Sequence, residues 1–239
     1  MVNIKKIKLN NNLIFFIIVI IICIFLIKKK LQKYWYNIPN IILVCILILY
    51  ILNLIDFNEI KLNFILPDND EIIIIDDFLQ DNQIESIIND SNKYLKDSKV
   101  ENNNISKIDN NIRKSKTAFL NKSNNKYIKL LRNQLQNKFN FKNIDIQYLY
   151  YNNDGFYKPH LDAFENKNEK DNRKYSILVY LNTPIEGATY FTKMNKRIKA
   201  KKGKAIVWKN LKNGLPDKNS EHTGEKVVGE KYCLNIWLT

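Results

Sequence analysis

The hydrophobic pattern divides the chain into two parts. Residues 13–27 and 41–55 are nearly unbroken apolar runs, whereas the later residues mix apolar and polar positions. A helix of about fifteen residues spans about 22 Å, less than the bilayer core of about 30 Å, but flanking lysines can snorkel to the interface. The two runs therefore predict an N-terminal membrane anchor at residues 1–60, with one or two spans.

Two other interpretations of the first apolar run are a signal peptide and a buried helix of a water-soluble core. The run is long for a signal peptide and no small-residue cleavage site follows it. A core helix would be unusually apolar on every face. Tyr34, Trp35 and Tyr36 lie between the two runs, where aromatic residues gather at a membrane interface. Lysines on both sides of the first run leave the membrane topology open.

The remaining residues predict a short linker at 61–70, which contains Pro67, and then one domain at 71–239. In the first half of this domain, apolar spacing and turn residues predict four segments. They are a strand within 71–79, a helix at 81–95 with Asp81 as its N-cap, an Asn-rich mobile loop at 97–111 and a helix at 126–139.

After residue 143 the apolar spacing changes from helical to strand-like. The predicted strands are Asp145–Tyr151, Lys158–Asp162, Tyr175–Leu181, Thr189–Phe191, Arg197–Lys199, Lys204–Trp208 and Lys231–Trp237. Two helices followed by seven or eight short strands, separated by turn residues, are typical of an α+β domain. We expect an antiparallel barrel or sandwich with the helices packed on one sheet.

Charge and cysteine content change this picture little. The formal net charge of +14 would attract nucleic acid, anionic lipid or an acidic peptide, but the lysines are spread along the chain and also fit ordinary surface solvation. The three cysteines have no CxxC or zinc-like spacing. A zinc site and a disulfide framework are therefore not expected.

The chain has only two histidines, and one of them lies in a His-x-Asp pattern. On a strand, His160 and Asp162 would point to the same face, and His222 could join them from a neighbouring strand. Two histidines and one carboxylate on one face of a metal form the facial triad of non-haem Fe(II) oxygenases. A lone His-x-Asp is a weak signal, since an isolated histidine is more often structural.

The residues around this pattern resemble the catalytic domain of the prolyl 4-hydroxylase family, and the resemblance extends over residues 71–239. The matching segments are IIDDFL (74–79), RKSKTAFL (113–120), YYNNDGFYKPHLD (150–162), RKYSILVYLN (173–182), IKAKKGKAIVWKN (198–210) and HTGEKVVGEKY (222–232). The resemblance implies a double-stranded β-helix, or jelly-roll, core of about eight antiparallel strands.

The resemblance also implies the iron ligands and the main co-substrate contact. By this match His160, Asp162 and His222 bind Fe(II), and Lys231 pairs with the distal carboxylate of 2-oxoglutarate. A buried carboxylate needs such a cation, because an unpaired one is costly. The interval from His222 to Lys231 is one residue shorter than is usual in the family.

Four further residues match family positions with less specific roles. Tyr151 matches a tyrosine that hydrogen-bonds the co-substrate carboxylate, and Thr189 matches a threonine near the co-substrate. Arg173 and Trp208 match positions on the peptide-binding side, although they would serve equally well as a surface charge and a core aromatic residue.

The expected activity is that of a 2-oxoglutarate-dependent dioxygenase, similar to procollagen-proline 4-dioxygenase. It would hydroxylate a prolyl residue in a peptide and convert 2-oxoglutarate to succinate, using Fe(II), O₂ and ascorbate. The resemblance to anchored members implies an endoplasmic reticulum membrane with a lumenal catalytic domain. The alternatives are a hydroxylase of another residue, an oxidative nucleic-acid demethylase, and an inactive membrane-tethered peptide-binding domain. The C-terminal sequence KYCLNIWLT lacks the arginines expected of a demethylase, so nucleic acid is an unlikely partner.

Overall fold

The structure is a computed structural model, and it describes Ile60, residues 62–102 and residues 105–239. The apolar runs predicted to span a membrane, 13–27 and 41–55, lie outside these residues. Within the described part, every helix is too short or too polar to cross a bilayer. Ile60 to Thr239 form one compact unit, and Phe64, from the predicted linker, is buried in its core.

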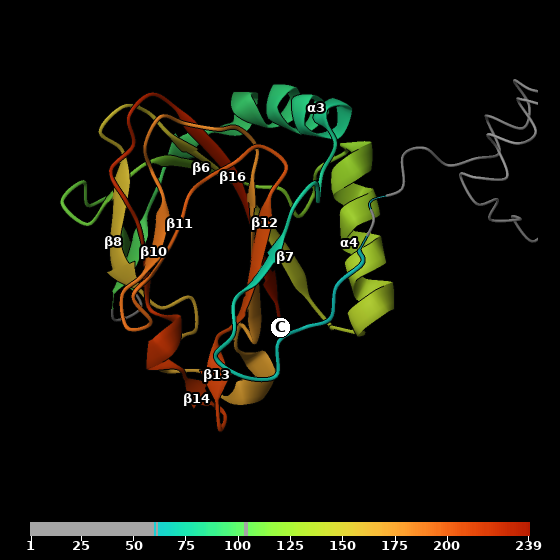
Figure 1. The fold of residues 1–239 in the computed structure, drawn as a ribbon, viewed down its shortest axis with the longest axis vertical. Coiled ribbons are helices and arrows are strands. Elements are labelled where there is room, and N and C mark those ends of the chain that lie inside the picture. The colour runs from blue at the N-terminus through green and yellow to red at the C-terminus, as the bar shows by residue number, and fades with distance from the viewer. Residues whose placement is uncertain (1–59, 61, 103–104) are drawn as a thin grey trace, which may run out of the picture. The chain divides into compact units, whose positions relative to one another are not determined.

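Most of the described strands form two antiparallel sheets (Figure 1). In spatial order, the seven-stranded sheet consists of β1 (Ile73–Ile75), β12 (Ala205–Lys209), β9 (Tyr175–Tyr180), β16 (Lys231–Leu238), β7 (Ile144–Tyr151), β6 (Lys116–Phe119) and β2 (Lys96–Asp97). The five-stranded sheet consists of β11 (Lys196–Ile198), β10 (Thr189–Phe191), β15 (His222–Gly224), β8 (Phe156–His160) and β5 (Arg113–Lys114). This mostly β core is consistent with the expected jelly-roll.

The other described elements are two helices, three short 3₁₀ turns and two hairpins. The helices are α3 (Asp81–Ser91) and α4 (Lys126–Phe139), and the 3₁₀ turns are η2 (Asn92–Tyr94), η3 (Glu169–Asp171) and η4 (Lys218–Ser220). The hairpins pair β3 (Val100–Asn102) with β4 (Ile105–Lys107), and β13 (Leu211–Lys212) with β14 (Leu215–Pro216). Both helices lie against the outer face of the larger sheet (Figure 1).

The alternation of residues along β16 shows how the larger sheet separates two packed layers. Leu234, Ile236 and Leu238 belong to the cluster under the helices, whereas Cys233 belongs to the cluster between the sheets. Successive residues of a strand point to opposite faces, so one strand can serve both layers. The residues facing the smaller sheet are therefore the ones that can reach a site between the sheets.

The helix ends follow from local hydrogen bonds. In α4, the Asn125 side chain caps the N-terminus by accepting from the backbone N–H groups of Tyr127 and Ile128, and Asn140 ends the helix in a left-handed conformation. The predicted bounds 126–139 are those observed. The predicted N-cap of α3 was wrong, because Gln80 caps that helix and Asp81 is its first residue.

Three expectations about the β structure need correction. The loop predicted at 97–111 contains the β3–β4 hairpin. The strand predicted at Lys158–Asp162 ends at His160. The short strands β2, β5 and β6 were not predicted, because two to four residues carry too little periodicity to stand out from a loop.

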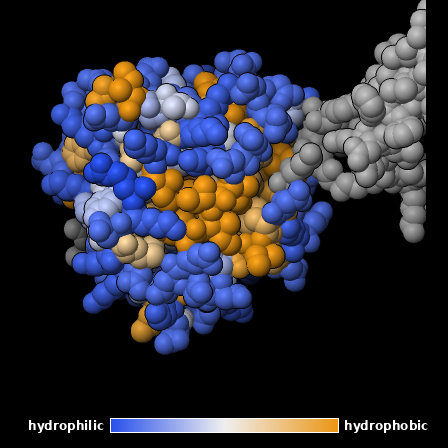
Figure 2. Space-filling model, in the orientation of Figure 1, coloured by the Kyte–Doolittle hydropathy of each residue, from blue (hydrophilic) through white to orange (hydrophobic). Residues whose placement is uncertain are grey.

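One apolar area is open on the surface. It lies over β1 and the segment before it, as Figure 2 shows in the orientation of Figure 1. Ile74 on β1 is 46% exposed and Ile65 is 77% exposed. Because β1 is the edge strand of the larger sheet, its outer side has no neighbouring strand among the described residues.

Candidate active site

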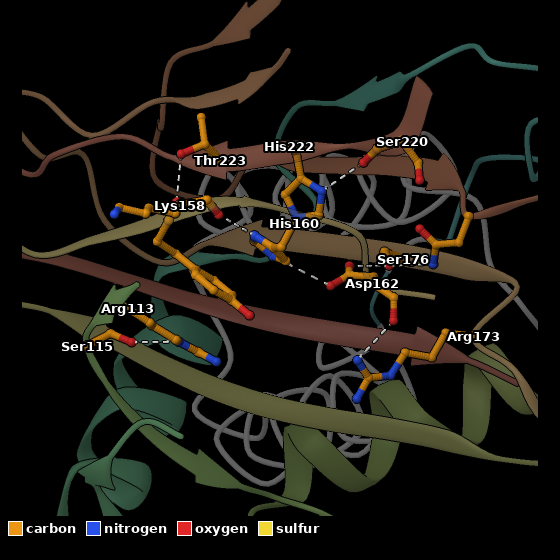
Figure 3. A network of polar contacts seen from close by, with 12 residues as sticks. Arg113, Ser115, Lys158, His160, Asp162, Arg173, Ser176, Ser220, His222 and Thr223 are labelled. Carbon is orange, nitrogen blue, oxygen red and sulfur yellow. Dashed lines mark hydrogen bonds and ion pairs between the residues drawn. The ribbon is translucent and has the colours of Figure 1, made fainter. Parts of the chain in front are cut away.

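Strand pairing in the smaller sheet brings the two histidines together. His222 on β15 and His160 on β8 are directly opposite each other in the antiparallel register. Asp162 follows the end of β8 and turns toward the same point (Figure 3). One ligand atom from each of the three side chains lies within 4.8 Å of the other two. The structure thus brings together the three residues predicted to bind iron.

Backbone carbonyls orient both imidazole rings. His160 Nδ1 lies 2.8 Å from the carbonyl oxygen of Lys158, and His222 Nδ1 lies 2.9 Å from that of Ser220 (Figure 3). A carbonyl oxygen only accepts, so each Nδ1 carries the proton and donates it. The lone pair of each Nε2 is then available to a metal ion.

The carboxylate of Asp162 is held by a buried polar chain. Ser176 Oγ on β9 donates to Asp162 Oδ2 over 2.6 Å, and Asn210 Nδ2 donates to Ser176 Oγ over 2.8 Å. Both Ser176 and Asn210 are fully buried. The second oxygen, Oδ1, faces His160 Nε2 at 3.9 Å. Outer contacts of this kind fix the orientation of metal ligands.

The protonation states also suit metal binding. Burial, together with the nearby His222, lowers the pKa of His160 to about 3. Burial alone would raise the pKa of Asp162, but its imidazole and guanidinium neighbours and the Ser176 hydrogen bond hold that pKa below its ordinary value. At neutral pH His160 is therefore neutral and Asp162 ionised. The contact between His160 and Asp162 is therefore not an ion pair. Instead, both groups can donate an electron pair to the same metal ion.

The donor set fits Fe(II). Two imidazole nitrogens and one carboxylate oxygen on one face match the facial triad of non-haem iron enzymes and leave the other coordination positions open. Adjacent ligands of an octahedral ion with bonds of about 2.1 Å are about 3 Å apart. The 3.9 Å between His160 Nε2 and Asp162 Oδ1 is about 1 Å wider, which small side-chain rotations close.

Aromatic residues pack around the histidines. The Tyr157 ring stacks on His160 with centroids 3.6 Å apart, and the Trp208 ring meets His222 edge-on at 4.9 Å. Trp208 is only 1% exposed and does not reach the cavity described below. Of the two interpretations of Trp208, the structure therefore favours the core aromatic residue over a contact with the peptide.

A buried cation lies at the inner end of the site. Lys231 on β16 is 3% exposed, and its Nζ donates to the carbonyl oxygen of Gly187 over 2.7 Å. Burial lowers the pKa of this ammonium group. Among the described residues, no carboxylate pairs with it. A buried cation without a counter-ion is costly, so the position favours an anionic ligand.

The two other predicted co-substrate residues surround Lys231. Tyr151 on β7 is its cross-strand partner, and the Lys231 ammonium lies 5.7 Å from the Tyr151 ring centroid. Thr189 on β10 is buried and accepts a 2.8 Å hydrogen bond from the hydroxyl of Tyr180. Burial raises the pKa of Tyr151 to about 12, so its hydroxyl stays a neutral donor. Together these groups can bind a carboxylate.

A single cavity of about 1320 Å³ contains both sets of residues. Its lining includes the three metal-binding side chains and also Lys231, Tyr151 and Thr189. A volume of this size exceeds that of a small ligand and leaves room for a second, larger one. A metal ion held by the three side chains and an anionic co-substrate held at Lys231 would thus share one cavity with a substrate.

Two arginines lie beside this space in Figure 3. Arg173 stacks on Trp237 with its guanidinium carbon 3.6 Å from the ring centroid, and it donates to the carbonyl oxygen of Asp162 over 3.2 Å. Arg113 on β5 lies over the Tyr157 ring at 4.6 Å and donates to Ser115 Oγ over 2.9 Å. Arg173 thus lines the cavity, and its expected place on the peptide-binding side stays a prediction.

Several site residues were not predicted. Ser176 and Asn210 are ordinary residues in a strand and a turn, and only their contacts give them a role. Arg113 and Tyr157 were not singled out either. All four residues lie within the matched segments 113–120, 150–162, 173–182 and 198–210, which was the available signal.

Comparisons with known proteins agree with this site. The sequence model of the 2OG-Fe(II) oxygenase superfamily matches residues 146–239, a stretch that contains all three metal-binding side chains and Lys231. Residues 146–239 are thus similar to a 2OG-Fe(II) oxygenase domain, and this similarity together with the metal site identifies the protein as a dioxygenase.

Among individual relatives, a predicted prolyl 4-hydroxylase of Acanthamoeba polyphaga mimivirus is 29% identical over 180 residues, covering 69% of this chain and 72% of the relative. The fold is shared with a viral collagen prolyl hydroxylase of Paramecium bursaria Chlorella virus-1, solved with 2-oxoglutarate, at a TM-score of 0.57 and 24% identity over 70% of this chain and 94% of that one. A Trichoplax adhaerens prolyl hydroxylase, solved with a peptide of hypoxia inducible factor, has a TM-score of 0.57 and 17% identity over 72% and 84%.

Proposed function

We propose that this enzyme hydroxylates prolyl residues in a peptide or protein, using Fe(II) and O₂ and converting 2-oxoglutarate to succinate. The observation that carries the proposal is one cavity with a two-histidine, one-carboxylate triad and, at its inner end, the buried Lys231 without a counter-ion. The relatives named above, all described as prolyl hydroxylases, support proline as the target.

The metal-binding and co-substrate-binding residues each have a definite task in this proposal. His160, Asp162 and His222 hold the metal, which supplies the oxidising chemistry when it is bound. Lys231 and Tyr151 bind the distal carboxylate of 2-oxoglutarate and so fix its position relative to the metal. The low dielectric of this buried end strengthens that ion pair.

The outer part of the cavity is suited to a peptide. Arg113 and Arg173 line it and can donate to backbone carbonyl oxygens, because a guanidinium group carries five N–H donors in a fixed arrangement. Tyr157 also lines it and offers aromatic surface to an apolar ring such as that of proline.

The test uses the purified full chain loaded with Fe(II), together with 2-oxoglutarate, ascorbate and a proline-rich peptide. We expect a peptide product about 16 Da heavier, hydroxyproline on amino-acid analysis, and an equal amount of succinate. Asp162→Asn should remove both products. Metal-loaded protein that forms neither product would contradict the proposal and would favour a peptide-binding domain without catalysis.

We further propose that ascorbate keeps the metal reduced and that residues 1–60 anchor the enzyme in the endoplasmic reticulum membrane with a lumenal catalytic domain. The two apolar runs support the anchor. Carbonate extraction should leave the chain in the membrane pellet, and protease should cut residues 60–239 only after the membrane is permeabilised. Cleavage in intact microsomes would contradict the lumenal placement.

A further inference from the structure

The cavity extends beyond the metal site to the edge of the larger sheet. There it is lined by residues of η2, β2 and β6 and of the segments beside them, among them Lys93, Tyr94, Lys96, Lys99 and Phe119. These five residues define the rim of the cavity. None of their side chains is needed to hold the metal or the co-substrate, so the rim is free to contact the substrate.

The strand register places Lys96 on the cavity side of the sheet. Lys96 pairs with Thr117 of β6, and Thr117 pairs with Leu149 of β7, which faces the smaller sheet. Directly paired residues of neighbouring strands share a face. The next pair, Asp97 with Lys116, is on the opposite face. Asp97 also borders the cavity, but the residue paired with it on β6 is Lys116, which offsets its negative charge.

The three rim lysines are exposed and have no ion pair with a carboxylate among the described residues. Seven other lysines and arginines of the described residues do have one, such as Arg197 with Glu225 at 2.7 Å and Lys226 with Asp154 at 2.7 Å. The rim thus carries three ammonium groups at the edge of the cavity that can bind an acidic ligand.

Two aromatic side chains accompany these lysines. Tyr94 is 57% exposed and Phe119 is 61% exposed, and the ammonium group of Lys93 lies 5.2 Å from the Tyr94 ring centroid. Exposed aromatic rings next to a groove are typical of surfaces that bind extended, proline-rich peptides. The combination of aromatic surface and lysines suits a peptide that is both extended and acidic.

We propose that the substrate is an extended peptide with acidic residues on one side of the target proline, and that Lys93, Lys96 and Lys99 select it. The inference rests on the proposed function and specifies its substrate class. From β16, which carries Lys231, to β2 there are three strand spacings, or about 14 Å. At about 3.1 Å per residue, an extended chain covers this distance in about four to six residues. Because Lys231 holds the co-substrate next to the metal, we place the acidic residues about four to six positions from the hydroxylated proline.

The first experiment compares three peptides that differ only in the two residues located about four to six positions from the proline: Glu, Gln or Lys. Hydroxylation by the full chain is followed by mass spectrometry. Exposed ion pairs are individually weak, but two glutamates facing three lysines should raise kcat/KM for the Glu peptide roughly tenfold over the Gln peptide, mainly through KM. The difference should shrink in about 0.5 M salt, because screening reduces exposed charge interactions.

The second experiment reverses the rim charge with K93E/K96E/K99E. A matched control, K142E/K196E/K199E, changes the net charge equally at exposed lysines that do not border the cavity. The rim variant should lose the preference for the Glu peptide and favour the Lys peptide instead, whereas the control should keep the preference for the Glu peptide.

The outcomes separate this inference from the proposed function. Equal kcat/KM for the Glu and Gln peptides, or an equal loss of preference in both triple variants, would overturn the acidic-substrate inference while leaving prolyl hydroxylation intact. Absence of hydroxylation on every peptide would count against the proposed function itself. If the rim variant fails to fold, the peptide series and its salt dependence on the unchanged protein still decide.

Discussion

Ser176 donates a hydrogen bond to Asp162 over 2.6 Å, across the interior between a strand of the larger sheet and the turn that follows β8. This contact fixes which carboxylate oxygen is occupied and which one is free to face the two histidines. Because Asp162 lies beyond the end of its strand, it needs this support more than His160 and His222 do, which sit within paired strands.

Ser176→Ala should weaken binding of Fe(II), or of Co(II) as an oxygen-stable substitute, about 10- to 100-fold, because loss of an outer contact to a metal ligand typically costs this much. Isothermal titration calorimetry of the full chain measures the change. Ser91→Ala is the matched control, since Ser91 is equally buried but its hydroxyl has no partner. Equal affinities for the Ser176 variant and the unchanged protein would contradict a role in holding Asp162.

Asn210→Ala should weaken metal binding less than Ser176→Ala, because Asn210 acts on the carboxylate only through the serine hydroxyl. The double variant should bind metal no more weakly than Ser176→Ala alone, since residues acting through one chain of hydrogen bonds are not additive. The same Co(II) titrations test this. Additive losses would mean that Asn210 reaches the metal site by another route.

The affinity for 2-oxoglutarate should fall as the pH rises through the lowered pKa of Lys231. Burial favours the neutral amine, whereas a bound carboxylate favours the ammonium form, so binding above that pKa takes up one proton. The dissociation constant should then rise by up to tenfold per pH unit, from the lowered pKa of Lys231 in the free protein up to its higher pKa in the complex.

The control for this pH dependence is Lys231→Arg, whose guanidinium group stays charged throughout. Titrations of 2-oxoglutarate into Co(II)-loaded protein between about pH 7 and pH 10 should show a flat profile for this variant and a slope for the unchanged protein. Identical slopes would assign the pH dependence to a group other than Lys231.

Gly187→Ala should destabilise the domain by about 1–3 kcal/mol and weaken 2-oxoglutarate binding. Gly187 has φ of +127°, and an added Cβ would lie 2.9 Å from Val227 Cγ2 and 3.5 Å from Lys231 Cδ. Thermal denaturation and co-substrate titration measure the two effects.

Gly229→Ala separates backbone strain from crowding in this test. Gly229 also has a positive φ, of +90°, but nothing lies within 4 Å of its added Cβ. This variant should lose stability without a change in co-substrate affinity. A Gly187 variant with unaltered affinity would show that the Lys231 side chain does not depend on the space left by this glycine.

The sequence determined the elements with strong periodicity. The α4 helix has the predicted bounds, and β7, β9 and β16 differ from the predicted strands by one residue at an end. These elements bury a large apolar face, so their pattern is long and clear. The edge strands β2 and β5, with two residues each, were missed because pairing with a neighbour defines them more than composition does.

In the site as well, the sequence identified some residues, and only the tertiary structure revealed the role of others. The residues His160, Asp162, His222 and Lys231 were predicted, because two histidines in the whole chain and a family resemblance left few alternatives. The support of Asp162 by Ser176 and Asn210 could not be predicted. Ser176 lies 14 positions after Asp162, Asn210 lies 34 positions after Ser176, and no common motif links them. Only the packing of β9 and the turn after β12 against the metal site gives these two polar side chains a function, because a hydrogen bond depends on position in space and not on separation in sequence.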